Sequence, residues 1–284
     1  MKKVLLSSML VSVAASMAFA ANPSTVSLST AGPNWVYTEF YPTMNTPGST
    51  TQTPTGHYNP GASLDIVKDG LNAFMWNVKV QGEGREYQAF NEIAASGSGN
   101  MASKTYGIWG VNQQTTIGTL KLDYKLVALS ATESYVQIMW TLKNTATTSR
   151  SFDLYSFNDL DGPENAQSDA GSYGNNIFTF KGNTGSMYAS SYGYGVTSYE
   201  MGAALGSGSV KDRLTDNSVT GMLSNSVAQN SGDLQGTFHY AMNVGANQSI
   251  SGTIVRGYNV VPEPATFVAL GAALLGVAAR RRKK

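Results

Sequence analysis

The sequence has no cysteine and only two histidines, His57 and His239. Without cysteine the chain cannot form a disulfide, a thiolate nucleophile or a zinc–thiolate site. Charged residues make up only 13% of the chain. The hydrolase motif G-x-S-x-G and the zinc-protease motif H-E-x-x-H are also missing. No familiar enzyme motif therefore marks an active site, and the fold must rely on its hydrophobic core.

The N-terminal residues combine a basic start with a short apolar run. Lys2 and Lys3 precede the apolar stretch 4–15, and small residues follow at the positions that a signal peptidase requires. The residues that define the cleavage site are Ala18, Ala20 and Ala21. The pattern predicts a secretory signal peptide, residues 1–20, which passes through the Sec translocon and is removed by signal peptidase.

Removing both ends changes the net charge of the protein. The full sequence has 19 Lys and Arg against 18 Asp and Glu, a net charge of +1. The two terminal segments hold seven cations and Glu263, so the body, residues 21–260, keeps 12 cations and 17 anions, a net charge of −5. Nucleic-acid binding needs a basic surface, so we expect no nucleic-acid partner.

Apolar and polar residues alternate along much of the body. Such alternation is typical of strands with one buried face. The clearest runs are Leu120/Leu122/Tyr124/Leu126, Val136/Ile138/Trp140/Leu142, Phe74/Trp76/Val78/Val80 and Phe238/Tyr240/Met242/Val244. The first two runs predict an antiparallel hairpin that turns at 130–133. We expect an all-β body, an antiparallel β-sandwich of jelly-roll-like or immunoglobulin-like type.

Residues 182–209 are rich in Gly, Ser and Tyr and do not follow the strand pattern. Tyrosines spaced by glycine can stack on sugar rings or support self-association. The candidate sugar platforms are Tyr192, Tyr194 and Tyr199. The alternative, which the composition favours, is a long irregular loop whose tyrosines lie on the sheet.

An acidic cluster follows the expected strand 152–157. Its candidate metal ligands are Asp159, Asp161, Glu164 and Asp169. A Gly-Pro turn at 162–163 can fold closely spaced carboxylates around one calcium ion, although the spacing differs from an EF-hand loop. The favoured alternative is an acidic turn whose side chains accept backbone hydrogen bonds. Calcium is the one cofactor that the sequence suggests.

Residues suited to catalysis are sparse. His239 lies between Phe238 and Tyr240 in an expected strand, so its side chain should face away from those aromatics. Two carboxylate pairs could hydrolyse glycosides if a sugar-binding cleft held each pair roughly 5–9.5 Å apart. The pairs are Glu83 with Glu86 and Asp159 with Asp161. Because residues 82–86 are better explained as a hairpin turn, we expect no enzyme activity.

The C-terminal end carries three features in a fixed order. Pro262 and Pro264 fix φ and keep the segment around Glu263 extended. The apolar segment 265–279 follows, and as a helix it would be about 22 Å long, short for a membrane span. Its anchoring side chains are Ala265, Phe267, Leu270, Leu274, Leu275 and Val277. The basic stop anchor, which the positive-inside rule places in the cytoplasm, is Arg280, Arg281, Arg282, Lys283 and Lys284.

This tripartite end, residues 261–284, resembles the PEP-CTERM sorting signal of Gram-negative bacteria. The resemblance implies recognition by an exosortase, a membrane protease that cuts near Pro262, Glu263 and Pro264 in hosts that make exopolysaccharide. It also implies transient anchoring in the inner membrane by a transmembrane helix, then transfer to the cell surface or extracellular matrix. An ordinary tail-anchored helix is the alternative.

A second, shorter resemblance covers residues 140–161. This stretch, WTLKNTATTSRSFDLYSFNDLD, looks like a pattern in secreted bacterial β-sandwich modules, and it implies a fold but no activity. We therefore expect an exported, non-catalytic structural or adhesive component of an exopolysaccharide or biofilm matrix. The alternatives are a carbohydrate-binding module with a calcium-assisted site and a glycan hydrolase or lyase.

Overall fold

The computed structural model describes residues 26–30, 36–39, 55–59, 64–69, 74–88, 92–110, 115–130, 133–159, 169–181, 188–203, 206–216 and 218–259. The expected signal peptide with its cleavage site and the sorting segment 261–284 lie outside the described residues. Among the residues described, no helix is long and apolar enough to cross a membrane. The expected membrane helix at 265–279 stays a prediction.

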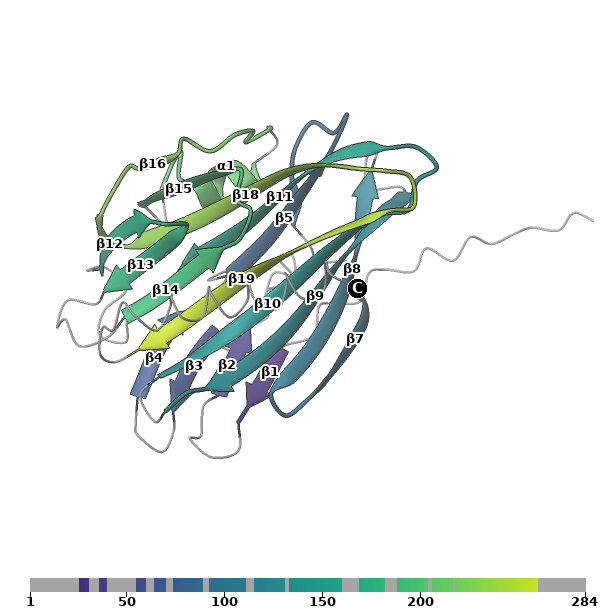
Figure 1. The fold of residues 1–284 in the computed structure, drawn as a ribbon. Helices are drawn as coiled ribbons and strands as arrows, with labels where there is room; N and C mark the ends of the chain where they lie inside the picture. Colours follow the sequence, from purple (N-terminus) through teal and green to yellow (C-terminus); the bar gives the residue numbers. More distant parts are fainter. Residues whose placement is uncertain are drawn as a thin grey trace, which may run out of the picture.

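One layer of the molecule is a nine-stranded antiparallel sheet (Figure 1). In sheet order its strands are β17 (Ser231–Gly232), β12 (Asp169–Gly174), β13 (Ile177–Lys181), β14 (Tyr188–Gly193), β19 (Ser249–Asn259), β10 (Glu133–Asn144), β9 (Thr115–Ala128), β8 (Met101–Gly110) and β7 (Glu92–Ser98). The predicted hairpin is confirmed, because β9 and β10 pair with Leu120 opposite Leu142.

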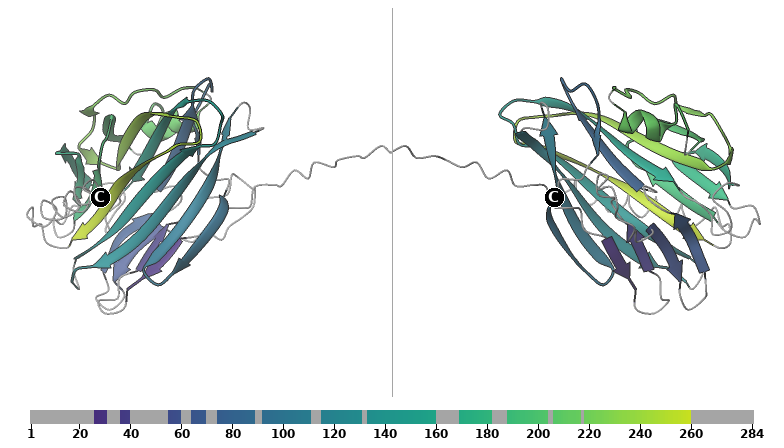
Figure 2. Two further views of the ribbon diagram at one scale, coloured as in Figure 1. Left: turned by 45° about the vertical axis from the view of Figure 1, so that its right-hand side comes forward. Right: turned by 180° about the vertical axis from the view of Figure 1, so that it is seen from behind.

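Two smaller sheets lie together against one side of this large sheet (Figure 2). The six-stranded sheet consists of β16 (Ser226–Val227), β15 (Ser198–Ala203), β18 (Leu234–Val244), β11 (Arg150–Asp159), β5 (Phe74–Val80) and β6 (Tyr87–Gln88). The four-stranded sheet consists of β1 (Val26–Ser29), β2 (Val36–Glu39), β3 (Thr55–Asn59) and β4 (Leu64–Asp69). One short helix, α1 (Val210–Thr215), lies on the six-stranded sheet.

The body is an all-β sandwich, as predicted, but it is larger than expected. A jelly roll has about eight strands in two sheets, whereas the large sheet alone has nine. The expected irregular loop at 182–209 is also wrong in part, because it contains β14 and β15. Gly and Ser are weak strand formers, but pairing with β13, β19 and β18 outweighs local preference.

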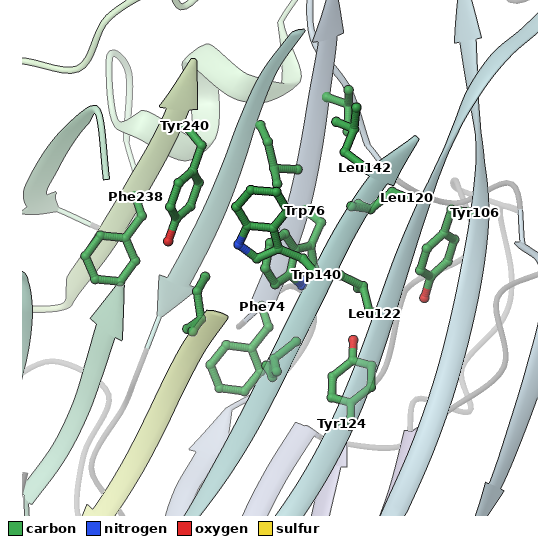
Figure 3. Packing of buried hydrophobic residues seen from close by; sticks show 14 of the residues in the cluster. Phe74, Trp76, Tyr106, Leu120, Leu122, Tyr124, Trp140, Leu142, Phe238 and Tyr240 are labelled. Atoms are coloured by element: carbon green, nitrogen blue, oxygen red, sulfur yellow. The ribbon is translucent and has the colours of Figure 1, made fainter. Parts of the chain in front are cut away.

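The hydrophobic core fills the space between the layers. Alternate residues of β10 are buried, and their side chains meet those of β5 and β18 (Figure 3). Trp140 lies against Gly252 of the neighbouring strand, where a Cβ atom would overlap the indole ring. Its ring also packs on Tyr240, with the ring centroids 5.1 Å apart. Burial of each large apolar side chain stabilises the fold by about 1.5–3 kcal/mol.

A buried arginine joins all three sheets inside this core. Arg256 of β19 is fully buried, and its Nε donates a hydrogen bond to Asn158 Oδ1 of β11 (2.9 Å). One terminal nitrogen donates to the Tyr37 hydroxyl of β2 (2.8 Å). The guanidinium carbon lies 3.7 Å from the ring centroid of Phe74 in β5. A buried charge is tolerated only when it is well hydrogen-bonded, so these strands must meet correctly for the core to close.

A buried asparagine ties together two of the connections that cross between layers. Asn144 ends β10, and its Nδ2 donates to Thr148 O (2.8 Å), Val244 O (2.9 Å) and Gly245 O (3.1 Å). Its Oδ1 accepts from the Ala146 N–H (3.0 Å). The β10–β11 and β18–β19 turns are therefore held by one side chain.

Replacing Asn144 with alanine should lower the free energy of unfolding by about 2–4 kcal/mol, because several buried backbone groups would lose their partner. Urea denaturation of residues 21–261, which contain every described strand, measures the loss. The exposed Asn230 provides a matched control: Asn230→Ala should change the free energy by about 0.5 kcal/mol or less. Equal losses in the two variants would contradict the proposed clamp.

Candidate functional site

A short segment covers the outer face of the six-stranded sheet. We call it the cap and define it as residues 206–216 and 218–225. Its helix α1 begins at the N-cap Ser209, whose hydroxyl accepts the Asp212 N–H (3.1 Å). The cap and the sheet share a small core of their own, formed by Met75, Tyr155, Phe157, Val210, Leu214 and Leu223.

Polar contacts also fasten the cap to the sheet. Asn77 Nδ2 donates to Leu214 O (3.1 Å), and the Tyr155 hydroxyl donates to Gly221 O (2.7 Å). The buried Glu86 carboxylate accepts the N–H and the hydroxyl of Thr220 (2.9 and 3.2 Å). Burial raises the pKa of Glu86, while the hydrogen bonds from Thr220 act in the opposite direction. Glu86 is therefore an anchor for the cap.

Beneath the cap, three side chains from different strands form a hydrogen-bonded row. Ser198 Oγ of β15 lies 2.8 Å from His239 Nδ1 of β18, and His239 Nε2 donates to Asp153 Oδ1 of β11 (2.9 Å). Tyr155 stacks on the imidazole with the ring centroids 4.6 Å apart. The prediction that His239 faces away from the aromatics beside it is confirmed, since those aromatics belong to the core.

Serine, histidine and aspartate are the groups of a hydrolase triad, but this row is closed to a substrate. Ser198 and His239 are each 1% exposed. The Ser198 hydroxyl also accepts the Leu223 N–H of the cap (3.1 Å). A nucleophile needs room for a reacting atom about 3 Å away, and the cap occupies that side. The described arrangement holds the cap in place and offers no approach to the hydroxyl.

The open end of the row carries charge. Asp153 is 27% exposed and lies 3.7 Å from the Lys79 ammonium group. Burial alone would raise the pKa of Asp153, but the hydrogen bond from His239 and the positive charges of His239 and Lys79 outweigh it. The pKa of the carboxyl is therefore lower than usual, which keeps it ionised beside its two partners.

The expected calcium ligands are only partly described. Asp159 ends β11, and its side chain is buried on the outer face opposite Gln235. Asp161 and Glu164 lie outside the described residues, and of Asp169 only the backbone at the start of β12 is described. Within the described part of the chain, no group of three acidic or histidine side chains surrounds a common point. Calcium binding stays a prediction.

The three candidate tyrosines do not share one surface. Ser191 and Gly193 of β14 face the core, where they approach Asn158 and Tyr240, so alternation turns Tyr192 and Tyr194 outward. Tyr199 of β15 faces the core instead. Its ring stacks on Tyr173 with centroids 3.5 Å apart. Only two of the candidates are therefore placed to meet a ligand.

Neighbouring strands complete the surface around these two tyrosines. The Tyr194 N–H donates to Thr253 O (3.1 Å), and Thr253 lies opposite Met139, which is 41% exposed. Burial raises the pKa of Tyr192, and the nearby phenol of Tyr194, itself 53% exposed, adds to the rise. We call this surface of the nine-stranded sheet the tyrosine face; its residues are Gln137, Met139, Tyr192, Tyr194 and Thr253. It combines aromatic rings with hydrogen-bonding groups.

Sequence reasoning missed most of these arrangements. Alternation predicted the direction of His239, but its partners Asp153 and Ser198 lie 86 and 41 residues away in the sequence. No motif links them, because the contact arises only when β11, β18 and β15 pair. Likewise, Met139 joins Tyr194 through the register of β10, β19 and β14.

Residues 260–283 match the family model of the PEP-CTERM protein-sorting motif. The predicted sorting motif is thereby confirmed. The match covers the C-terminal end only and carries no information on the sandwich. Comparison of the sequence with curated proteins gives no match.

Solved structures resemble the sandwich at low identity. A bacterial glucoamylase complexed with acarbose superposes with a TM-score of 0.55 at 11% identity, covering 89% of this chain and 36% of the glucoamylase. A polysaccharide lyase (TM-score 0.44, 9% identity, covering 86% and 33%) and a putative aldose 1-epimerase from Escherichia coli K12 (0.43, 7%, 84% and 100%) are more distant. The chain thus spans about a third of the glucoamylase, and that likeness concerns the fold alone.

Acid should weaken the protein through Asp153. Because its folded pKa is lowered, its contribution to stability is complete above the unfolded value, about 3.9, and is lost as the pH falls through the folded value. Asp153→Asn should therefore be less stable at neutral pH and lose less stability on acidification. Urea unfolding over a pH series measures this difference.

Asp123→Asn is the control, because it alters an ion pair with Lys121 on the opposite sheet. Its unfolding free energy should depend on pH with the wild-type slope. A wild-type slope in Asp153→Asn would contradict the assignment.

Proposed function

We propose that the protein is an exported, non-catalytic component of the cell surface or exopolysaccharide matrix, sorted by an exosortase. The observation that carries this proposal is the match of residues 260–283 to the PEP-CTERM motif. In this reading the segment 265–279 holds the precursor in the inner membrane until cleavage near Glu263. The body is then transferred to the surface or the matrix.

The position of β19 suits cleavage of this kind. β19 is the last described strand, ends at Asn259 and is paired on both sides by β14 and β10. The Pro-Glu-Pro sequence begins three residues later. Because the two prolines favour an extended backbone, a protease could reach this segment without disturbing the paired strand. The sandwich would keep its last strand after cleavage.

A non-catalytic role is supported by how the polar groups are used. The Ser198 hydroxyl and the Glu86 carboxylate, two natural candidates for catalysis, accept hydrogen bonds from the cap. The His239 ring is buried between Ser198 and Asp153. An enzyme would need them exposed to a substrate. A glycan hydrolase or lyase therefore has less support than a surface component.

Contact with a polysaccharide would use the tyrosine face. Tyrosine rings offer apolar faces for the C–H groups of a sugar, and their hydroxyls provide hydrogen bonds. Gln137 and Thr253 add polar groups beside them. A carbohydrate-binding module with one defined site is the second candidate, because these residues come together on one surface. In its calcium-assisted form, the acidic cluster at 159–169 would bind the ion.

Replacing Pro262, Glu263 and Pro264 together with alanine should stop processing of the precursor. Pulse-labelling of the native host, with immunoblotting of membrane and extracellular fractions, should find the uncleaved protein in the membrane. Thr266→Ala changes the adjoining apolar segment but keeps the motif, so it should be processed like wild type. Normal processing of the triple variant would contradict exosortase sorting.

Alanine at both Tyr192 and Tyr194 should weaken binding of residues 21–261 to the host's own exopolysaccharide by about tenfold or more, since stacking on aromatic rings contributes about 1 kcal/mol each. Calorimetric titration in calcium and in EDTA measures the affinity. Tyr87→Ala removes a tyrosine from the six-stranded sheet and should bind normally. An unchanged affinity in the double variant would rule out the tyrosine face, and an effect of EDTA would favour the calcium-assisted module.

A further inference from the structure

The two large sheets end very differently at their edges. The six-stranded sheet ends in β16 and β6, and the nine-stranded sheet ends on one side in β17; each of these strands has two residues. Short edge strands protect a sheet from pairing with other chains. The remaining edge is β7, which has seven residues (Figure 1). Of the four described edge strands of the two larger sheets, β7 is therefore the one long strand.

β7 lacks the usual protection of a long edge. Residues 93–99 (IAASGSG) contain neither charge nor proline, and all of them are exposed. Ile93 is 56% exposed, and Met101 just after the turn is 57% exposed. A bulge at Ile93 disturbs only the start of the strand, because the register from Ala94 to Ser98 is regular. Charges, prolines and bulges along the strand would block pairing, and they are absent from this regular part.

The outward backbone groups of β7 are suited to hydrogen bonding with an added strand. β8 pairs with one side of β7, so alternate N–H and C=O groups of β7 point the other way. β1 contacts the C-terminal end of β7. There the Ser29 N–H donates to the carbonyl oxygen of Gly99, the residue that follows β7 (2.9 Å). No described strand lies beyond β7 in the sheet order. An extended strand could add here and satisfy the outward groups.

We propose that the added strand is β7 of a second copy of this protein, paired antiparallel about a twofold axis. Two such strands oppose only Ala, Ser and Gly from Ala94 to Ser98, so no like charges meet although the body carries a net charge of −5. A twofold axis perpendicular to the sheet keeps the inner and outer faces of both copies aligned. The two nine-stranded sheets then form one continuous sheet.

Such pairing is weak in solution and stronger on a crowded surface. One strand pair buries less area than the roughly 1,200 Å² of a stable interface. When many copies are displayed together, the effective concentration raises the paired fraction without new contacts. Because β7 lies on a different part of the sheet from the tyrosine face, pairing leaves that face open. The inference stands independently of glycan binding.

Sedimentation equilibrium of residues 21–261 from micromolar to millimolar concentration tests the pairing. We expect a reversible monomer–dimer equilibrium that Ser96→Lys weakens by about tenfold or more, because Ser96 is the middle residue of the segment from Ala94 to Ser98 and two lysines are then held close to the axis. Ser251→Lys places the same charge on β19, an interior strand, and should dimerise like wild type. A protein that stays monomeric throughout, or equal weakening by both variants, would overturn the proposal. Thermal melts establish that both variants fold.

A cysteine scan provides a second test, since the chain has no cysteine of its own. In an antiparallel pair with a twofold axis, one residue lies opposite its own copy. Single cysteines placed from Ala94 to Ser98 and then oxidised should form a disulfide dimer most readily at one of these positions. Ser251→Cys should stay monomeric under the same conditions. Equal crosslinking at Ser251 and throughout β7 would reveal random collision and contradict the pairing.

Discussion

The buried guanidinium group of Arg256 is the constraint on which the sandwich depends. Its hydrogen bonds to Asn158 and Tyr37 and its contact with the Phe74 ring bring together strands from all three sheets. A charged group inside a core is tolerated only with such partners. The four-stranded sheet is therefore tied to the same point as the two larger sheets. Asn144 applies a similar constraint at the β10–β11 and β18–β19 turns, which also cross between layers.

The two outer faces of the sandwich differ in what they present to solvent. The face of the six-stranded sheet is covered by the cap. Ser198 and Glu86 accept hydrogen bonds from the cap, and His239 is buried beside Ser198. The face of the nine-stranded sheet presents Tyr194 and Met139. The proposed contact with a polysaccharide therefore concerns this second face, where aromatic and apolar side chains are exposed.

Prediction from sequence succeeded where the signal was local. Alternation located the β9–β10 hairpin and the direction of His239, because side chains on a strand point to opposite faces in turn. The prediction of an irregular loop at 182–209, made from composition, failed because pairing with distant strands imposed strand structure on weak strand formers. The same prediction grouped Tyr199 with Tyr192 and Tyr194, although Tyr199 belongs to the opposite sheet and stacks on Tyr173.

The sequence by itself determined that the protein carries a sorting motif. The PEP-CTERM motif is a short linear sequence, so residues 260–283 are recognised without knowledge of the fold. Tertiary structure decided everything that depends on distant partners. The Ser198–His239–Asp153 row, the tyrosine face and the position of β7 at the edge of the described sheet each follow from strand order and register. Register is a property of paired strands, and a single strand's sequence does not contain it.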